Sequence, residues 1–178
     1  MMTPDEELAA AAADGDAQAF ESLLARHYDR LFAFCWRITG SRSEAEDLTQ
    51  DICLALPAKL GTYQRRAKVT TWLYRVAYNA AQDRRRKRAR QERLSTGWGA
   101  WETERQAANA ETQERRDWLT GAMQMLGPDL RDTLALVLDD MTHAQAGEVL
   151  GISEGTVSWR ISEAKKILRR IREQEGVA

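Results

Sequence analysis

Apolar residues recur at intervals of three and four along most of the chain, and this spacing constrains the fold more than any other feature. Residues three and four apart share one face of a helix, whereas a half-buried strand would alternate residue by residue. Because such alternation is nearly absent, the sequence predicts an all-α protein whose first long helix ends at Gly40. The apolar positions of that helix are Phe20, Leu24, His27, Leu31, Phe34 and Ile38.

Capping signals predict where further helices begin. A capping box pairs Ser or Thr with Glu or Gln three residues later, and it is predicted at Thr3–Glu6, Ser43–Glu46 and Thr142–Gln145. The helix opened by the second box is expected to kink or shorten in its last turn at Pro57, which lacks a backbone N–H. Its apolar stripe is formed by Leu48, Ile52, Leu56 and Leu60.

The segment 95–110 interrupts the helical periodicity with glycine and polar residues, which is typical of a linker. The chain is therefore predicted to form two small helical domains, 1–94 and 114–178, joined by a flexible linker at 95–113. Trp98 and Trp101 are unusual in such a linker. They are expected either to pack against a domain or to contact a partner protein.

Charge is strongly segregated although the net charge is only −1. Between Arg65 and Arg93 there are eleven Lys or Arg residues and two acids, while the first 21 residues hold six acids and no Lys or Arg. The basic stretch follows the aromatic residues Trp72, Tyr74 and Tyr78 on one proline-free helix. Cations neutralise phosphates and aromatic rings can receive unstacked bases, so this helix favours nucleic acid over a merely solvated tail.

Several functional classes are disfavoured by what the sequence lacks. No apolar run reaches the roughly 18 residues that span a bilayer, and the acidic N-terminus is unlike a signal peptide, so a cytoplasmic protein is expected. Cys35 and Cys53 form no CxxC or Cys/His cluster, which argues for buried thiols and against zinc. With no phosphate-binding loop and no catalytic grouping, neither an enzyme nor a cofactor is predicted.

The C-terminal third is predicted to contain a helix-turn-helix. A short helix after Thr142 is followed by a turn at Gly151, and Ser153 is placed to cap a second helix that runs to about Arg170. The inward residues of this second helix are Val157, Ile161, Ala164 and Leu168. In such motifs the N-terminal part of the second helix enters the major groove of DNA.

Three blocks in this order resemble the extracytoplasmic-function group of bacterial sigma factors, the small promoter-specificity subunits of RNA polymerase. They are Ala45–Asp51, Thr71–Asn79 with the arginines that follow, and Leu150–Arg160. The resemblance implies two helical domains, sigma region two and sigma region four. It also implies a dissociable, non-enzymatic factor that directs core polymerase to promoters, assists promoter opening and is controlled by an anti-sigma factor.

The first block has a helical face of its own, opposite its apolar stripe. By the resemblance, this face docks on the clamp helices of the largest polymerase subunit, while the second domain meets the flap region. The alternative is a solvated acidic face, but an exposed leucine beside acids favours a protein interface. The residues predicted to bind polymerase are Asp47, Gln50, Asp51 and Leu54.

The second block, with the loop before it, is implied to read and melt the minus-ten element of the promoter. Trp72 can equally be a core residue of the bundle. The loop departs from the family pattern because neither glycine nor an acid follows Tyr63, which leaves the identity of the flipped base open. The predicted minus-ten residues are Tyr63, Gln64, Arg65, Arg66, Lys68, Trp72, Arg75, Asn79, Asp83, Arg84, Arg85, Arg86, Lys87 and Arg88.

The second helix of the helix-turn-helix is implied to read the minus-thirty-five element. Thr156 and Arg160 are the favoured base contacts, whereas Glu163 departs from the usual basic residue. Trp159 has three possible roles: core packing, contact with a thymine methyl group, or contact with the sugar backbone. The predicted minus-thirty-five residues are Thr142, Ser153, Glu154, Thr156, Ser158, Trp159, Arg160, Ser162, Glu163, Lys165 and Lys166.

One alternative function stays open at this point, namely a stand-alone helix-turn-helix repressor or activator. Against it, the basic helix and the recognition helix lie about seventy residues apart, which suits two separated promoter elements better. A magnesium site at Asp47 and Asp51 is disfavoured because both acids lie on one isolated helical face. Free in solution, the two domains are expected either to cover their own DNA surfaces or to be held by an anti-sigma factor.

Overall fold

The computed structural model of this chain describes residues 3–94 and 116–176. Within these ranges the chain is all-α, as predicted, and contains no strand. The predicted linker, with Trp98 and Trp101, lies outside the described residues. The first four helices are α1 (Asp5–Ala13), α2 (Ala17–Thr39), α3 (Arg42–Leu60) and α4 (Val69–Leu94). The next four are α5 (Arg116–Gln124), α6 (Pro128–Leu138), α7 (His143–Leu150) and α8 (Glu154–Glu175).

Two of the predicted capping boxes are wrong. Helix α3 is capped by Ser41, whose hydroxyl oxygen accepts from the backbone N–H of Glu44 at 3.3 Å. Gly40 ends α2 in the left-handed conformation, so that the next residue, Ser41, is extended and can serve as this cap. Ser43 is already inside the helix. Helix α1 follows Pro4 without any side-chain cap. Pro57 does not shorten α3, which continues to Leu60.

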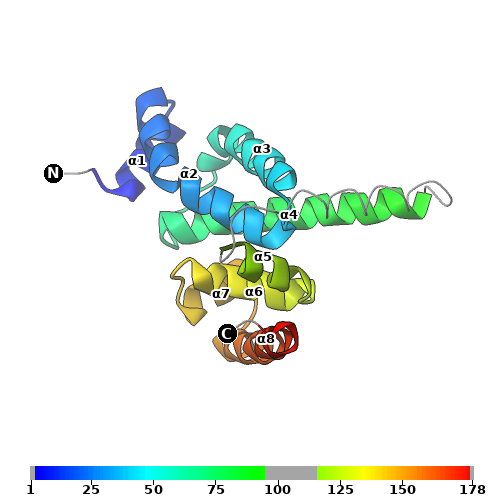
Figure 1. Cartoon of the computed structure of the whole chain (residues 1–178). Coiled ribbons are helices and arrows are strands. Elements are labelled where there is room, and N and C mark those ends of the chain that lie inside the picture. The colour runs from blue at the N-terminus through cyan, green and yellow to red at the C-terminus, as the bar shows by residue number, and fades with distance from the viewer. Residues whose placement is uncertain (1–2, 95–115, 177–178) are drawn as a thin grey trace.

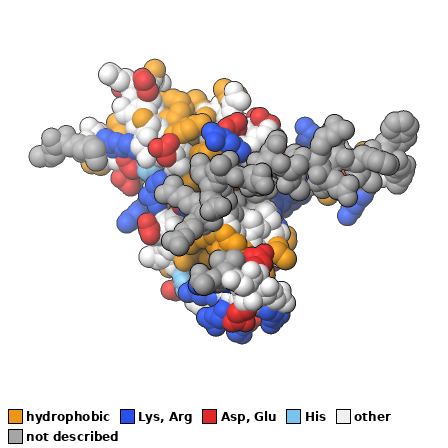
Figure 2. Space-filling model, in the orientation of Figure 1, with side chains coloured by type: hydrophobic (Ala, Val, Ile, Leu, Met, Phe, Trp, Pro, Cys, Tyr) orange, Lys and Arg blue, Asp and Glu red, His pale blue; other side chains and the backbone are white. Residues whose placement is uncertain are grey.

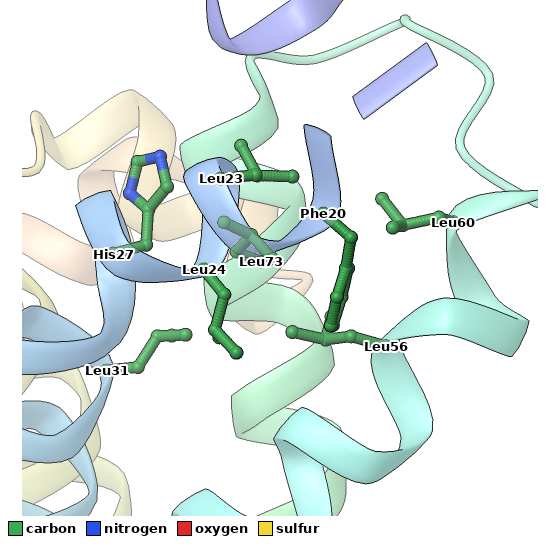
Figure 3. A pocket seen from close by; sticks show the side chains of 8 residues that line it. All are labelled: Phe20, Leu23, Leu24, His27, Leu31, Leu56, Leu60 and Leu73. Atoms are coloured by element: carbon green, nitrogen blue, oxygen red, sulfur yellow. The ribbon is translucent and has the colours of Figure 1, made fainter. Parts of the chain in front are cut away.

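The core of the first half lies between α2, α3 and α4. Phe34 and Tyr74 are buried there, with ring centroids 5.4 Å apart in an edge-to-face arrangement. Figure 3 shows an imperfectly filled part of this core, an apolar cavity of about 10 Å³ beside Phe20 and His27. This volume is close to that of one water-sized sphere, and an apolar lining gives a water no partners, so the cavity holds no ligand site.

The two cysteines differ in their surroundings. Cys35 is completely buried in α2, and burial raises the pKa of its thiol to about 11. Cys53 on α3 is half-buried. The expected burial therefore holds fully for Cys35 alone.

The second half contains the predicted helix-turn-helix, formed by α7 and α8. Thr142 and Gln145 make the predicted capping box, with both hydrogen bonds present. Gly151 ends α7 in the left-handed conformation, and Ser153 caps α8 by accepting from the backbone N–H of Thr156 at 3.1 Å. A side chain at Gly147 would meet the backbone oxygen of Ile152 at 2.7 Å, so glycine lets the turn approach the first helix closely.

The two halves pack directly on each other. Helices α2 and α4 of the first half contact α5, α6 and α7 of the second, while α8 lies on the far side (Figure 1). The C-terminal part of α4 projects beyond this body (Figure 1). At Gly40 an added Cβ would lie 2.4 Å from the side chain of Gln124, which shows how closely the halves approach. We refer to this direct contact of α1–α4 with α5–α8 as the closed arrangement.

Candidate functional site

The face of α3 opposite the core carries the four residues predicted to bind a protein partner. Asp47, Gln50, Asp51 and Leu54 are all exposed. Leu54 is 75% exposed, the highest value among the exposed large apolar residues of α1–α3. An exposed leucine that follows two carboxylates on the same helical face offers both apolar area and negative charge.

Helix α4 supplies the cations nearest to this acidic face. The guanidinium of Arg84 lies 3.6 Å from Asp47 Oδ2 and 3.5 Å from Asp51 Oδ2. One turn later, Arg88 reaches Glu44 Oε1 at 3.2 Å. Two arginines that were predicted to contact DNA therefore face α3, and in this arrangement they order its acidic side chains.

The exposed cations toward the C-terminal end of α4, namely Arg86, Lys87, Arg90 and Arg93, are not buried in the bundle. Asp83 and Arg86 form a long ion pair of 3.8 Å within the helix, and both side chains are well exposed. Some of these cations are visible at the projecting end of α4 (Figure 2). A shallow groove there is lined by Asp83, Arg86, Lys87, Ala89, Arg90, Arg93 and Leu94. This end of α4 is the part of the described chain best suited to follow a phosphate backbone.

The loop before α4 is anchored by an aromatic pair. The rings of Tyr63 and Trp72 lie 5.4 Å apart, and the Tyr63 hydroxyl donates to the backbone oxygen of Ala67 at 2.6 Å. Both residues are half-buried, so Trp72 is neither a fully buried core residue nor a free platform. The remaining predicted residues here are exposed, namely Gln64, Arg65, Arg66, Lys68, Arg75 and Asn79.

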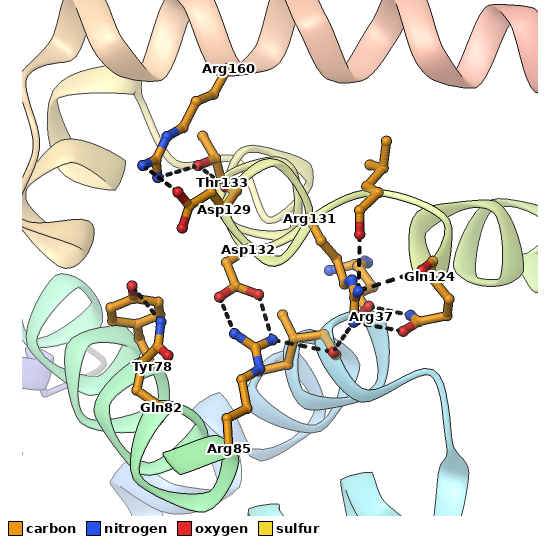
Figure 4. A network of polar contacts seen from close by, with 12 residues as sticks. Arg37, Tyr78, Gln82, Arg85, Gln124, Asp129, Arg131, Asp132, Thr133 and Arg160 are labelled. Carbon is orange, nitrogen blue, oxygen red and sulfur yellow. Dashed lines mark hydrogen bonds and ion pairs between the residues drawn. The ribbon is translucent and has the colours of Figure 1, made fainter. Parts of the chain in front are cut away.

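A polar network joins α4 to α6 across the two halves (Figure 4). Arg85 donates twice to Asp132, with Nη2 2.8 Å from Oδ1, and this hydrogen bonding raises the pKa of the guanidinium although burial opposes it. Arg131 donates to the backbone oxygen of Ile38 at 3.2 Å and to Gln124 Oε1 at 2.9 Å. Burial lowers the pKa of Arg131, and the charge of Arg85 adds to this effect.

A second buried carboxylate, Asp139, lies between α6 and α7 and binds the first half. Its side chain accepts from Arg37 on α2 and from the Tyr74 hydroxyl on α4, the latter at 2.9 Å. Its backbone oxygen accepts from Arg30. Burial and the charge of Asp139 together raise the pKa of Tyr74 well above its usual range, so the phenol stays a donor.

The closed arrangement occupies two residues of the predicted minus-ten face. Arg85 is bound to Asp132, and Arg75 donates to the backbone oxygen of Glu148 on α7 at 2.6 Å. Sequence reasoning did not identify Asp132 or Asp139 as functional. An aspartate within an apolar helical stretch gives no local signal of a partner that lies in another part of the chain.

At the start of helix α8, several of the side chains predicted to contact DNA already form hydrogen bonds within the protein. Arg160 is only 16% exposed, because its guanidinium turns back to Asp129 Oδ2 at 3.1 Å (Figure 4). Trp159 is 61% exposed, which excludes the core position that the sequence had left open for it. Thr142, Ser153, Glu154, Ser158, Ser162, Lys165 and Lys166 are exposed, whereas Thr156 and Glu163 are half-buried. Lys and Arg side chains gather over the lower end of the molecule, where α8 lies (Figure 2).

Comparison with known proteins identifies both halves. The model of Sigma-70 region 2 matches residues 23–91, and that of Sigma-70 region 4 matches residues 116–168. The ECF RNA polymerase sigma factor SigM of Mycobacterium tuberculosis is 31% identical over 169 residues, which cover 94% of this chain and 84% of SigM. The chain belongs to the ECF sigma factors of RNA polymerase. SigW of Bacillus subtilis, another ECF sigma factor, is 28% identical, with 88% of this chain and 90% of SigW covered.

Solved structures share the fold of this sigma factor. CnrH, in complex with the cytosolic domain of CnrY, matches with a TM-score of 0.71 and 25% identity over 96% of this chain and 97% of CnrH. RpoE from Bartonella quintana, in complex with the anti-sigma factor NepR, matches in fold with a TM-score of 0.74 and 24% identity over 90% of this chain and 99% of RpoE.

The sigma regions coincide with the two halves of the structure. Region 2 takes in most of α2, all of α3 and most of α4, and region 4 takes in α5 to most of α8. The domain limits at 94 and 114 stay predictions. Across residues 3–94 and 116–176, no helix is long and apolar enough to cross a membrane. The same residues contain no group of three or more possible metal ligands of the His, Cys, Asp or Glu type.

Proposed function

We propose that this sigma factor binds core RNA polymerase reversibly in the cytoplasm, brings it to promoters with two sequence elements, and assists opening of the minus-ten element. It would act as a specificity subunit without chemistry of its own. One observation carries the proposal: three exposed surfaces of different character lie on separate helices of one small chain. They are the acidic and apolar face of α3, the basic projecting end of α4, and the helix-turn-helix of α7 and α8.

The face of α3 is proposed to bind the clamp helices of the largest polymerase subunit. Asp47 and Asp51 supply negative charge that would steer the encounter with a basic surface, and Leu54 supplies apolar area that becomes buried. Arg84 already orders both carboxylates, which lowers the entropy that binding must remove. The flap region of polymerase is the proposed contact of region 4.

The loop before α4 and the helix itself are proposed to hold the opened minus-ten strand. Unstacking a base costs a few kcal/mol, and contact with an aromatic ring and with phosphate-binding cations can offset this cost. Trp72 lies in the first turn of α4 and packs on Tyr63 of the loop before it, and this loop also carries the exposed Arg65 and Arg66. The exposed cations farther along α4, such as Lys87 and Arg90, would follow the backbone of the same strand.

The closed arrangement is proposed to be a form that must open before promoter binding. The two promoter elements are centred about 25 base pairs apart, or about 85 Å at about 3.4 Å for each base pair. Two halves in direct contact cannot reach across that distance. Opening would also release Arg75 and Arg85 for the minus-ten strand. RpoE, which shares this fold, is bound to the anti-sigma factor NepR, and we extend to this chain the proposal that an anti-sigma factor controls it.

The proposal is tested by co-purifying the tagged protein with bacterial core polymerase and then performing run-off transcription on a genomic fragment library. We expect a stable complex and initiation from fragments that share a two-part motif, only when the protein is added. Failure to bind core polymerase after any bound partner has been removed would refute the proposal. If such a protein still bound DNA, the alternative of a stand-alone repressor or activator would replace it.

A further inference from the structure

Trp159 stands out on the recognition helix because a large apolar side chain lies in solvent. It is 61% exposed, while Val157 and Ile161 on the opposite face of α8 are buried. Because most of its surface is in solvent, the indole adds little to the packing of region 4. A residue of this size at the start of a recognition helix therefore points to a contact outside the chain.

Three polar residues close to Trp159 in sequence are already hydrogen-bonded within region 4. Ser158 Oγ lies 2.8 Å from His143 Nδ1 on α7, and Thr156 Oγ1 lies 2.8 Å from Ser153 Oγ at the helix cap. Arg160, the favoured guanine contact from sequence, is held against Asp129. These residues would have to break internal hydrogen bonds in order to read a base, whereas Trp159 would break none.

The surroundings of Trp159 leave room for a close approach of DNA. Side chains of a helix lean toward its N-terminus, so the indole leans toward the turn that contains Gly155, four residues earlier. Gly155 is exposed, and an added Cβ there would meet only the Ser153 hydroxyl at 3.9 Å. Glu163, on the next turn of the same face, is paired with Lys166 at 2.6 Å, which reduces its repulsion of phosphates.

We propose that Trp159 contacts the 5-methyl group of a thymine in the minus-thirty-five element and is a specificity-determining residue of this sigma factor. The inference rests on the proposed function. The thymine methyl is the one apolar group that the bases present in the major groove, and it is the natural partner for an apolar ring. An indole carries no positive charge and has a single N–H donor, so it is poorly suited to neutralising a phosphate.

The test replaces the thymines of the identified minus-thirty-five element with uracil, one at a time, and measures binding of the full-length protein in holoenzyme. Uracil pairs like thymine but lacks the methyl group. We expect one such replacement to weaken wild-type binding about fourfold, the value for burying one methyl-sized group. With Trp159→Ala this replacement should have no effect, and Trp159→Phe should restore part of the sensitivity. Because the side chain is exposed, helical content and core-polymerase affinity should not change.

Three results would overturn the inference. The first is an element without thymine, or a uracil penalty that is the same in Trp159→Ala and wild type. The second is a Trp159→Ala variant that binds every minus-thirty-five element more weakly by the same factor, while no uracil replacement affects wild-type binding. This result would indicate a contact with the sugar backbone. The third is a loss of core-polymerase binding by Trp159→Ala, which would indicate a protein contact. If the wild-type holoenzyme recognised no promoter at all, the proposed function itself would fail, and this result is distinct from the other three.

Discussion

Two pairs of aspartates in this molecule have opposite surroundings. The side chains of Asp47 and Asp51 on α3 are 62% and 70% exposed, with only Arg84 at 3.6 and 3.5 Å. Those of Asp132 and Asp139 are 2% and 7% exposed, and each accepts hydrogen bonds from an arginine of the other half. An exposed ion pair contributes about 0–1 kcal/mol, whereas a buried carboxylate is tolerated only with its partners in place. The first pair is available to a partner protein, and the second holds the closed arrangement together.

The difference also indicates why the closed arrangement can be reversible. Charges buried in an interface lose their hydration, and they regain it when the interface separates. Opening the two halves would therefore rehydrate Asp132, Asp139 and their arginines, which offsets part of the lost contacts. A purely apolar interface would have no such compensation. The buried pair thus makes contact between the halves specific without making it permanent.

The largest effect is expected from Asp132→Ala. The substitution leaves the half-buried guanidinium of Arg85 without a carboxylate and with only the backbone oxygen of Ile38 at 3.4 Å, and we expect the closed arrangement to lose about 3 kcal/mol. Separation of the halves relieves this loss, so small-angle scattering should report a larger radius of gyration while helical content is retained. Asp47→Ala is the matched control and should leave the radius unchanged. A compact Asp132→Ala protein would show that the buried pair does not hold the halves together.

Reversing the charge of the exposed pair, Asp47 and Asp51, should instead affect only the binding of the partner protein. Asp47→Arg combined with Asp51→Arg is expected to weaken core-polymerase binding about a hundredfold, because like charges across an interface cost several kcal/mol. Competition binding against a labelled wild-type protein measures this. The control Glu21→Arg with Asp29→Arg makes the same change of charge at exposed positions of α2. Equal weakening by both variants would mean that net charge, and not the α3 face, matters.

The comparison also shows what the sequence could predict. The spacing of Asp47, Asp51 and Leu54 correctly predicted an exposed helical face, because helical periodicity is a local property. The roles of Asp132 and Asp139 were missed, since their partners lie 47 and 102 residues away along the chain. Both aspartates look like ordinary surface acids in a sequence.

The cations of α4 were assigned to one surface for a related reason. The run from Arg84 to Arg88 was predicted to contact the DNA backbone as a whole. In the structure, Arg84 and Arg88 face α3, Arg85 faces α6, and Arg86 lies in the exposed groove. Consecutive residues of a helix point in directions about 100° apart, so a run of five necessarily covers every side of it. Which side meets DNA is decided by tertiary packing.

Asp5 is intermediate between the two pairs and should give the smallest effect. Its side chain is 28% exposed and accepts from Arg26 and His27, both at 2.8 Å. Burial alone would raise the pKa of Asp5, but these two hydrogen bonds and charges outweigh it, and the pKa lies below its ordinary value of 3.8. We expect Asp5→Asn to cost about 0.5–1 kcal/mol at neutral pH, as partly exposed ion pairs do.

The pH dependence separates this effect of charge from a loss of packing. A carboxyl whose pKa is lowered by folding stabilises the protein fully above its unfolded pKa, and this contribution is lost as the pH falls through the folded pKa. The difference in melting temperature between wild type and Asp5→Asn should therefore be constant above about pH 5, and it should disappear as the pH falls below 3.8. A difference that persists unchanged into strong acid would mean that Asp5 acts through its shape. It would then resemble neither the exposed aspartates of α3 nor the buried ones that join the two halves.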